Sequence, residues 1–157
     1  MKLESLIGKN ILIVGYGREG KASYEFLKKT VPSASFTVVD AKDGRHYLDR
    51  QEEFDMAIKS PGVPKQLMRI PYTTATNIFF GNTRGMVIGV TGSKGKSTTA
   101  SLIYSILNAA GKRAQLVGNI GNPALDELVK EKGEDAMYVY ELSSYQLDDI
   151  VYSPHIS

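Results

Sequence analysis

The 157-residue sequence predicts an α/β protein in which short buried strands alternate with helices. Three observations support this prediction. Short apolar runs recur along the chain and stop at glycine or proline, as strands buried in a parallel sheet do. Two of these runs are followed by segments whose apolar residues have helical spacing. A glycine-rich segment stands at both of these strand-to-helix junctions, which is typical of nucleotide-binding βα units.

The first part of the chain is expected to form a βαβ sheet. The run Asn10–Gly15 predicts a strand, and the following segment Arg18–Thr30 predicts a helix with Ala22, Phe26 and Leu27 on its buried face. Two further strands are predicted at Phe36–Asp40 and Met56–Ser60. Pro71–Gly85 is rich in Thr, Asn and Gly without a periodic pattern, so it is expected to be a linker, with a domain boundary near residue 84.

A second βα pattern is expected after the boundary, in residues 85–157. Strands are predicted at Met86–Val90, Gln115–Val117 and Ala136–Glu141, and helices at Lys96–Ala110 and Ala124–Lys132. In the first of these helices, one face is expected to carry Leu102, Ile103, Ile106, Leu107 and Ala110. About three strands are predicted here, whereas a complete doubly wound domain usually has five or more, so this domain is expected to be partial.

The composition excludes several classes of protein. The net charge of +2 comes from 19 basic and 17 acidic residues spread along the chain, so a nucleic-acid partner is not expected. There is no cysteine, which excludes disulfides, thiolate metal sites and a cysteine nucleophile. Because no apolar run approaches the length of a membrane span, we interpret the protein as cytoplasmic and without membrane insertion.

The segment Thr91–Thr99 predicts an ATP-binding phosphate loop. Gly92 and Gly95 let the main chain approach phosphates, Lys96 supplies a cation, and the Ser97 hydroxyl is placed for Mg²⁺. The predicted ATP-binding residues are Gly92, Ser93, Lys94, Gly95, Lys96, Ser97 and Thr98. The strict pattern Gly-x4-Gly-Lys-Ser/Thr is not met, because its first glycine falls at Val90. A glycine turn followed by chance by a lysine is the alternative.

Two polar positions in the second part complete the candidate ATP site. Glu141 ends a predicted strand, so it is expected at the carboxyl edge of the sheet as a second Mg²⁺ ligand beside Ser97. Asn119 lies in the glycine-rich segment Gly118–Pro123, where its amide could face phosphates or an acceptor carboxylate. A solvent-facing carboxylate and a plain helix-capping loop are the respective alternatives.

The first glycine segment, Gly15–Gly20, fits Gly-x-Gly-x-x-Gly directly after a strand. Asp40 follows at the end of the next predicted strand, where such a carboxylate bonds a ribose. Alone, this arrangement predicts NAD binding. The same geometry serves any nucleotide diphosphate, and it also occurs where a helix simply packs tightly on a strand.

The combined motifs resemble the N-terminal part of the Mur ligase D family, the UDP-N-acetylmuramoyl-L-alanine:D-glutamate ligases of peptidoglycan synthesis. The segments that carry the resemblance are Ser60–Val63, Gly89–Thr99, Gly118–Leu125 and Tyr140–Leu147. The phosphate loop is shared with folylpolyglutamate synthetases, whereas Glu-Leu-Ser-Ser-aromatic-Gln-Leu is similar to the D-glutamate-adding member. The resemblance implies a Rossmann-like domain over residues 1–84 and part of a P-loop-type ATP-binding central domain over residues 85–157, without the C-terminal ligase domain.

The resemblance also implies a reaction and a set of site residues. The reaction is ATP-dependent amide formation with Mg²⁺, through an acyl-phosphate of UDP-N-acetylmuramoyl-L-alanine that the amine of D-glutamate then attacks. Lys96 and Glu141 are the implied catalytic residues. The implied substrate-binding residues are Arg18, Glu19, Asp40, Ser60, Gly62, Asn119 and Ser143. Arg18, Glu19 and Lys94 depart from the family's usual residues.

Two other functions stay open at this point. A non-catalytic nucleotide-binding module would keep the glycine loops without ligase activity, and an NAD-dependent oxidoreductase would rest on Gly15–Gly20 alone. Another ligase of the Mur or folylpolyglutamate type is a third alternative. Because the remaining ligase machinery of the family lies beyond the position that corresponds to Ser157, the chain alone is expected to form no amide.

Overall fold

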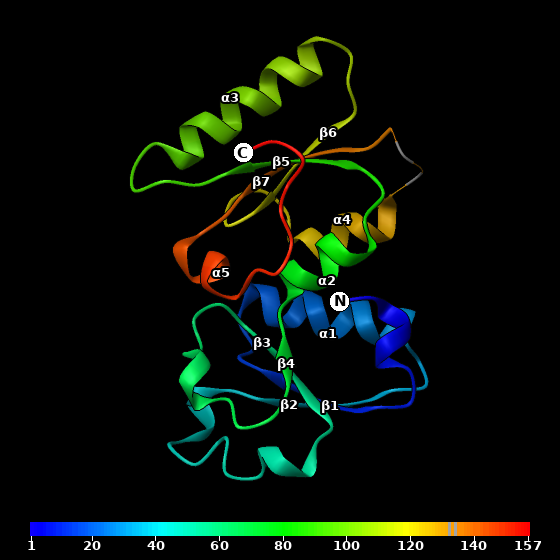
Figure 1. The fold of residues 1–157 in the computed structure, drawn as a ribbon, viewed down its shortest axis with the longest axis vertical. Helices are drawn as coiled ribbons and strands as arrows, with labels where there is room; N and C mark the ends of the chain where they lie inside the picture. Colours follow the sequence, from blue (N-terminus) through cyan, green and yellow to red (C-terminus); the bar gives the residue numbers. More distant parts are fainter. Residues whose placement is uncertain (132, 134) are drawn as a thin grey trace.

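The computed structural model describes residues 1–131, 133 and 135–157, and it shows two parallel sheets with helices between them (Figure 1). The α/β class predicted from the sequence is therefore confirmed. The strands and α-helices are β1 (Asn10–Val14), α1 (Arg18–Thr30), β2 (Ser35–Val39), β3 (Met56–Lys59), β4 (Tyr72–Thr73), α2 (Ala75–Asn82), β5 (Met86–Val90), α3 (Lys96–Ala109), β6 (Ala114–Gly118), α4 (Ala124–Lys130), β7 (Met137–Glu141) and α5 (Ser144–Asp149). Short 3₁₀ helices lie at Leu3–Leu6, Ala41–Asp43, Gln51–Glu53 and Lys65–Leu67.

The first sheet contains four parallel strands in the order β2-β1-β3-β4. Strand β1 lies in its interior, and the side chains of Ile11–Val14 are at most 1% exposed. Ile11 and Ile13 pack toward the helices, whereas Leu12 and Val14 pack on the opposite face with Leu48 and Ala57. A strand that is buried on both faces explains why this part of the sequence is continuously apolar rather than alternating.

The second sheet contains three parallel strands in the order β5-β7-β6. The registers pair Val90 with Glu141 and Gly118 with Glu141, so the carboxyl ends of all three strands meet at one edge. Helix α3 covers the face that carries Val90 and Val139, as Figure 1 shows at the top of the molecule. In the part of the chain that the structure describes, no helix is long and apolar enough to cross a membrane.

Helices α1, α2 and α4 lie between the two sheets and share one core with both of them (Figure 1). Phe26 and Leu27 of α1 and Ile78 and Phe79 of α2 belong to the same buried cluster as Tyr138 of β7. The ring of Phe79 meets that of Tyr138 edge to face, with 5.0 Å between ring centroids. The two sheets therefore bury a common layer of helices, while the predicted domain boundary at residue 84 stays a prediction.

The prediction that Pro71–Gly85 is a linker without regular structure is wrong. This segment forms β4 and the buried helix α2, which begins with the Thr74 hydroxyl accepting a hydrogen bond from the Asn77 N–H. Helix α2 lies between two sheets, so both its apolar and its polar side chains are buried. A helix without a solvent-facing side has no amphipathic period, which is the signal that the sequence analysis required.

The predicted buried face of α3 is partly wrong. Ile103 and Leu107 pack on the second sheet with Ala100 and Tyr104, whereas Leu102 and Ile106 are 59% and 58% exposed. Leu102 and Ile106 each precede one of the buried residues by one position and have the same four-residue spacing. Spacing alone therefore could not show which pair is buried. For α4, the predicted end at Lys132 lies outside the described residues, and the helix that the structure describes ends at Lys130.

Candidate functional site

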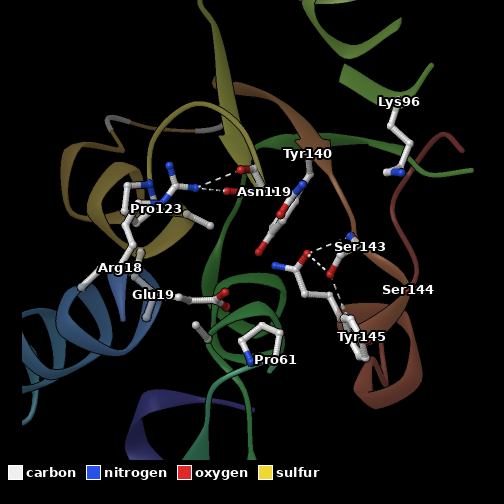
Figure 2. Close-up of a pocket in the computed structure, with 16 residues that line it drawn as sticks. Arg18, Glu19, Pro61, Lys96, Asn119, Pro123, Tyr140, Ser143, Ser144 and Tyr145 are labelled. Carbon is white, nitrogen blue, oxygen red and sulfur yellow. Dashed lines mark hydrogen bonds between the residues drawn. The ribbon is translucent and has the colours of Figure 1, made fainter. Parts of the chain in front are cut away.

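A cavity of about 510 Å³ lies between the carboxyl edges of the two sheets (Figure 2). Several of its walls follow the end of a strand: Arg18 and Glu19 come after β1, Pro61 after β3, and Asn119 after β6. The remaining lining comes from Ala22, Ala75, Lys96, Gly118, Pro123, Ala124, Leu125, Tyr140, Ser143, Ser144, Tyr145 and Gln146. Ligands of open α/β sheets bind at this edge, so the cavity is the candidate functional site.

Arg18 joins the glycine loop Gly15–Gly20 to the segment Gly118–Pro123. Its guanidinium N–H groups donate to the carbonyl oxygens of Gly118 at 2.7 Å and Asn119 at 3.2 Å (Figure 2). A further N–H donates to the Gly121 carbonyl at 3.2 Å. Arg18 is the first residue of α1, whereas the carbonyls belong to the loop between β6 and α4. The Arg18 side chain therefore connects two walls of the cavity, and these walls are about a hundred residues apart in the sequence.

Glu19 points into the cavity from the first turn of α1 (Figure 2). The residue as a whole is partly exposed, but its Oε1 atom is buried and has no hydrogen-bond partner among the described residues. Burial raises the pKa of Glu19 from 4.5 to about 7, although the charges of Arg18 and Lys59 and the amide of Gln146 act in the opposite direction. Glu19 is therefore a carboxyl group that titrates near neutral pH.

The raised pKa of Glu19 predicts a loss of stability as the pH rises. The unfolded chain ionises near pH 4.5 and the folded chain near pH 7, so the free energy of unfolding should fall between these values. The shift allows at most ~3 kcal/mol, and partial exposure reduces the expected loss to about 2 kcal/mol. Urea unfolding at a series of pH values measures it. Glu19→Gln should lack this loss, whereas the exposed Glu25→Gln on the same helix should retain it.

Asp40, Ser60 and Gly62 lie outside the described lining of the cavity, so their substrate-binding roles stay predictions. The Asp40 carboxylate accepts from the Tyr16 N–H at 2.6 Å and the Lys42 N–H at 3.1 Å, and these bonds lower its pKa, the first more than the second. The Ser60 hydroxyl donates to the Gly15 carbonyl at 2.9 Å. Both side chains hold the first glycine loop against the ends of neighbouring strands.

The predicted phosphate loop lies at the junction of β5 and α3, with Gly95 as the N-cap residue at φ +77°. Within the described part of the chain, no side chain caps this helix, so its first N–H groups can receive an anion. The Lys96 ammonium donates to the Gly92 carbonyl at 2.9 Å, and the Lys96 side chain also lines the cavity. Ser93, Lys94, Ser97 and Thr98 are exposed around the loop.

Glu141 is completely buried at the end of β7, next to the residue that precedes the phosphate loop. Its Oε1 accepts from the Asn119 side-chain amide at 2.9 Å, while its Oε2 has no partner among the described residues. A buried carboxylate oxygen without a donor is costly unless a further group binds it. The alternative that Glu141 is a solvent-facing carboxylate is therefore wrong, and the alternative of a plain capping role for Asn119 does not account for its bond to Glu141.

The short helix α5 and the buried ion pair behind it were not predicted from the sequence. Helix α5 begins with a capping box in which the Ser143 hydroxyl accepts from the Gln146 N–H and the Gln146 side chain accepts from the Ser143 N–H. At its other end, Asp149 pairs with Lys59 of β3 at 2.6 Å, and both side chains are only 2% exposed. The Ser-x-x-Gln spacing could have indicated the helix, but nothing local pairs Lys59 with Asp149.

Comparisons with known proteins relate the sequence to a family of ligases. Residues 90–156 match the family described as Mur ligase middle domain. The chain is 34% identical to a UDP-N-acetylmuramoyl-L-alanine--L-glutamate ligase from Xanthomonas euvesicatoria pv. vesicatoria (strain 85-10), over 96% of this chain and 38% of the relative. It is 35% identical to a UDP-N-acetylmuramoylalanine--D-glutamate ligase from Streptococcus agalactiae serotype III (strain NEM316), over 95% of this chain and 39% of the relative.

These similarities confirm the resemblance to the glutamate-adding Mur ligases that the motifs indicated. The chain spans about two fifths of the length of the curated relatives that it matches. The names of these relatives include both isomers of glutamate, so the D isomer predicted from Tyr140–Leu147 stays a prediction.

Proposed function

We propose, from the similarity to glutamate-adding Mur ligases, that this chain is the nucleotide-binding part of an ATP-dependent amide ligase of peptidoglycan synthesis. The ligase joins glutamate to UDP-N-acetylmuramoyl-L-alanine in the cytoplasm, and so serves cell-wall growth and cell division. We assign the first sheet to a Rossmann-like domain that holds the UDP-sugar, and the second sheet to a P-loop-type domain that holds ATP. The names of the two relatives reported above state that they are ligases of UDP-N-acetylmuramoyl-alanine and glutamate.

One observation supports this function above the others: Lys96 belongs both to the phosphate loop and to the lining of the cavity. A phosphoryl group bound on the loop amides therefore lies next to the space where the acceptor carboxylate is expected. Phosphoryl transfer requires this adjacency, because most of its catalysis consists of positioning and charge stabilisation. A nucleotide-binding module without transfer would not need a lysine shared between the two sites.

Glu141 and Ser97 fit a Mg²⁺ ion. The Oε2 of Glu141, which has no hydrogen-bond partner among the described residues, is buried at the same sheet edge as the phosphate loop. Ser97 follows Lys96 at the start of α3. Carboxylate and hydroxyl oxygens are the ligands that Mg²⁺ prefers, and phosphate oxygens and water usually complete its shell. Asn119 would orient the Glu141 carboxylate through its hydrogen bond to Oε1. Mg²⁺ would supply charge neutralisation on the phosphates.

The residues of this chain would act in the first half of the reaction. The loop amides and Lys96 hold the phosphates while an oxygen of the alanyl carboxylate attacks the terminal phosphorus and the bond to ADP breaks. The amine of glutamate then attacks the acyl carbon, phosphate leaves, and the amine loses a proton. Arg18, Glu19, Asn119 and Ser143 would surround the UDP-sugar. We expect the 157-residue chain alone to bind nucleotides without forming the amide.

The role of Lys96 is tested by Lys96→Met in ATP titration calorimetry. We expect ATP to bind about tenfold to hundredfold more weakly, because a hydrogen bond from a charged donor contributes about 1.5–3 kcal/mol. Lys112→Met, at an exposed position beyond the other end of α3, is the matched control and should bind ATP like the original chain. Equal ATP affinities in both variants would contradict the assignment. Tighter binding of NAD than of UDP would instead assign the first glycine loop to an oxidoreductase.

A further inference from the structure

Glu19 is the one acidic residue that lines the candidate cavity, within the residues that the structure describes. It lies in the first turn of α1, directly after the Gly15–Gly20 loop. Its side chain points into the cavity (Figure 2), and its Oε1 atom is buried and lacks a hydrogen-bond partner within the described part of the protein. A carboxyl group on a cavity wall that is not fully hydrogen-bonded is placed to contact a ligand.

Several charged and titratable groups surround Glu19, but each described cation is already held elsewhere. The Arg18 guanidinium donates to carbonyl oxygens of the Gly118–Gly121 loop, and the Lys59 ammonium pairs with Asp149. Lys96 of α3 donates to its own loop. The remaining groups that face the cavity are Tyr140 of β7 and Tyr145 and Gln146 of α5. No ion pair to Glu19 is found among the described residues, so its ionised form is poorly compensated.

The proposed ligand would bring further negative charge to this place. A glycine loop followed by a helix N-terminus is the usual seat of a pyrophosphate, and the pyrophosphate of a UDP-sugar carries two charges. An ionised Glu19 would repel these charges at close range. A protonated Glu19 would instead donate its O–H to a phosphate oxygen, so the carboxyl group would gain a hydrogen bond from the ligand.

We propose that Glu19 takes up one proton when the cavity binds a nucleotide diphosphate sugar, and that the protonated acid donates a hydrogen bond to a phosphate oxygen. This inference rests on the proposed function, which places a UDP-sugar here. Because the free carboxyl has a pKa of about 7, the proton is mostly absent above neutral pH and must come from solvent. Affinity for the ligand should therefore fall about tenfold per pH unit above neutrality.

The test is titration calorimetry with UDP-N-acetylglucosamine, whose pyrophosphate is esterified at both ends and does not titrate near neutral pH. The titration is run near pH 6 and near pH 8, in buffers of different ionisation enthalpy, so that the heat reports proton uptake directly. We expect uptake of nearly one proton per ligand near pH 8 and much less near pH 6. Glu19→Gln keeps the shape and a donor, and it should bind without proton uptake and without the pH dependence.

Glu25→Gln, on the exposed side of the same helix, is the matched control and should behave like the original chain. Binding of the UDP-sugar without proton uptake would overturn the role of Glu19 and leave the proposed function intact. Binding that needs Mg²⁺ and shows no uptake would also overturn it, since a cation would then bridge the carboxylate and the phosphates. Absence of UDP-sugar binding at both pH values would overturn the proposed function, and the inference with it.

Discussion

Lys59→Met is expected to lower the free energy of unfolding by about 3–5 kcal/mol, because it leaves Asp149 as a buried charge without its cation. The pair joins the end of β3 to the end of α5 at 2.6 Å, with 2% of each side chain exposed. Asp149 also accepts from the Tyr72 hydroxyl at 2.9 Å, and Lys59 donates to the Val63 carbonyl at 2.8 Å. The whole network holds α5, one wall of the cavity, against the first sheet.

The neighbouring pair Lys65–Asp148 is a matched control, because it joins the same two regions at 2.7 Å but with side chains 40% and 57% exposed. Lys65→Met should cost at most about 1 kcal/mol in urea unfolding. The double variant of Lys59→Met with Asp149→Asn should cost less than Lys59→Met alone, since no unpaired charge is left. Equal costs for Lys59→Met and Lys65→Met would show that the buried pair is not important for stability.

Gly121→Ala is expected to be the second strongly destabilising change, with a cost of about 2–5 kcal/mol. The residue has φ +73°, and left-handed backbone costs a non-glycine residue about 1–2 kcal/mol. A Cβ at this position would also lie 2.0 Å from the Leu116 carbonyl oxygen, which accepts the Asn122 N–H. Relieving such a clash adds about 1–3 kcal/mol. The Gly121 carbonyl accepts from Arg18, so the cavity wall should shift as well.

Gly111→Ala separates these two contributions. Gly111 has nearly the same backbone angle, φ +74°, but no atom of the described residues lies within 4 Å of a Cβ built there. Its replacement should therefore cost only the backbone term of about 1–2 kcal/mol. Thermal or urea unfolding of the two variants measures the difference. If both variants lose the same stability, the close approach of Gly121 to Leu116 has no energetic consequence.

Most strands and helices could be predicted because their signals are local. Strand β1 is apolar throughout since both of its faces are buried, and the predicted helix Arg18–Thr30 agrees with α1 because one of its sides meets solvent. The glycine loops at Gly15–Gly20 and Gly92–Gly95 were recognisable for the same reason, since a strand, a turn and a helix follow one another directly.

The elements that were missed depend on contacts between distant parts of the chain. Helix α2 is buried on every side, and its polar residues are satisfied far away: Thr76 by the Tyr140 hydroxyl, and Asn77 by the backbone of Asp149 and Val151. The sequence of such a helix has no helical pattern of apolar residues, so it resembles an irregular segment unless its distant partners are known. The exposure of Leu102 and Ile106 on α3 likewise depends on which side of the helix meets the sheet.

The sequence by itself determined the α/β class, the two glycine loops and the set of candidate residues, because backbone turns and side-chain periods are properties of neighbouring residues. Only the tertiary structure decided that the two loops face one cavity, that Lys96 belongs to both the loop and the cavity, and that Lys59 meets Asp149. The tertiary structure also decided the direction in which the pKa of Glu19 shifts. The pKa of a carboxyl group depends on the solvent and the charges around it, and these are set by packing rather than by sequence neighbours.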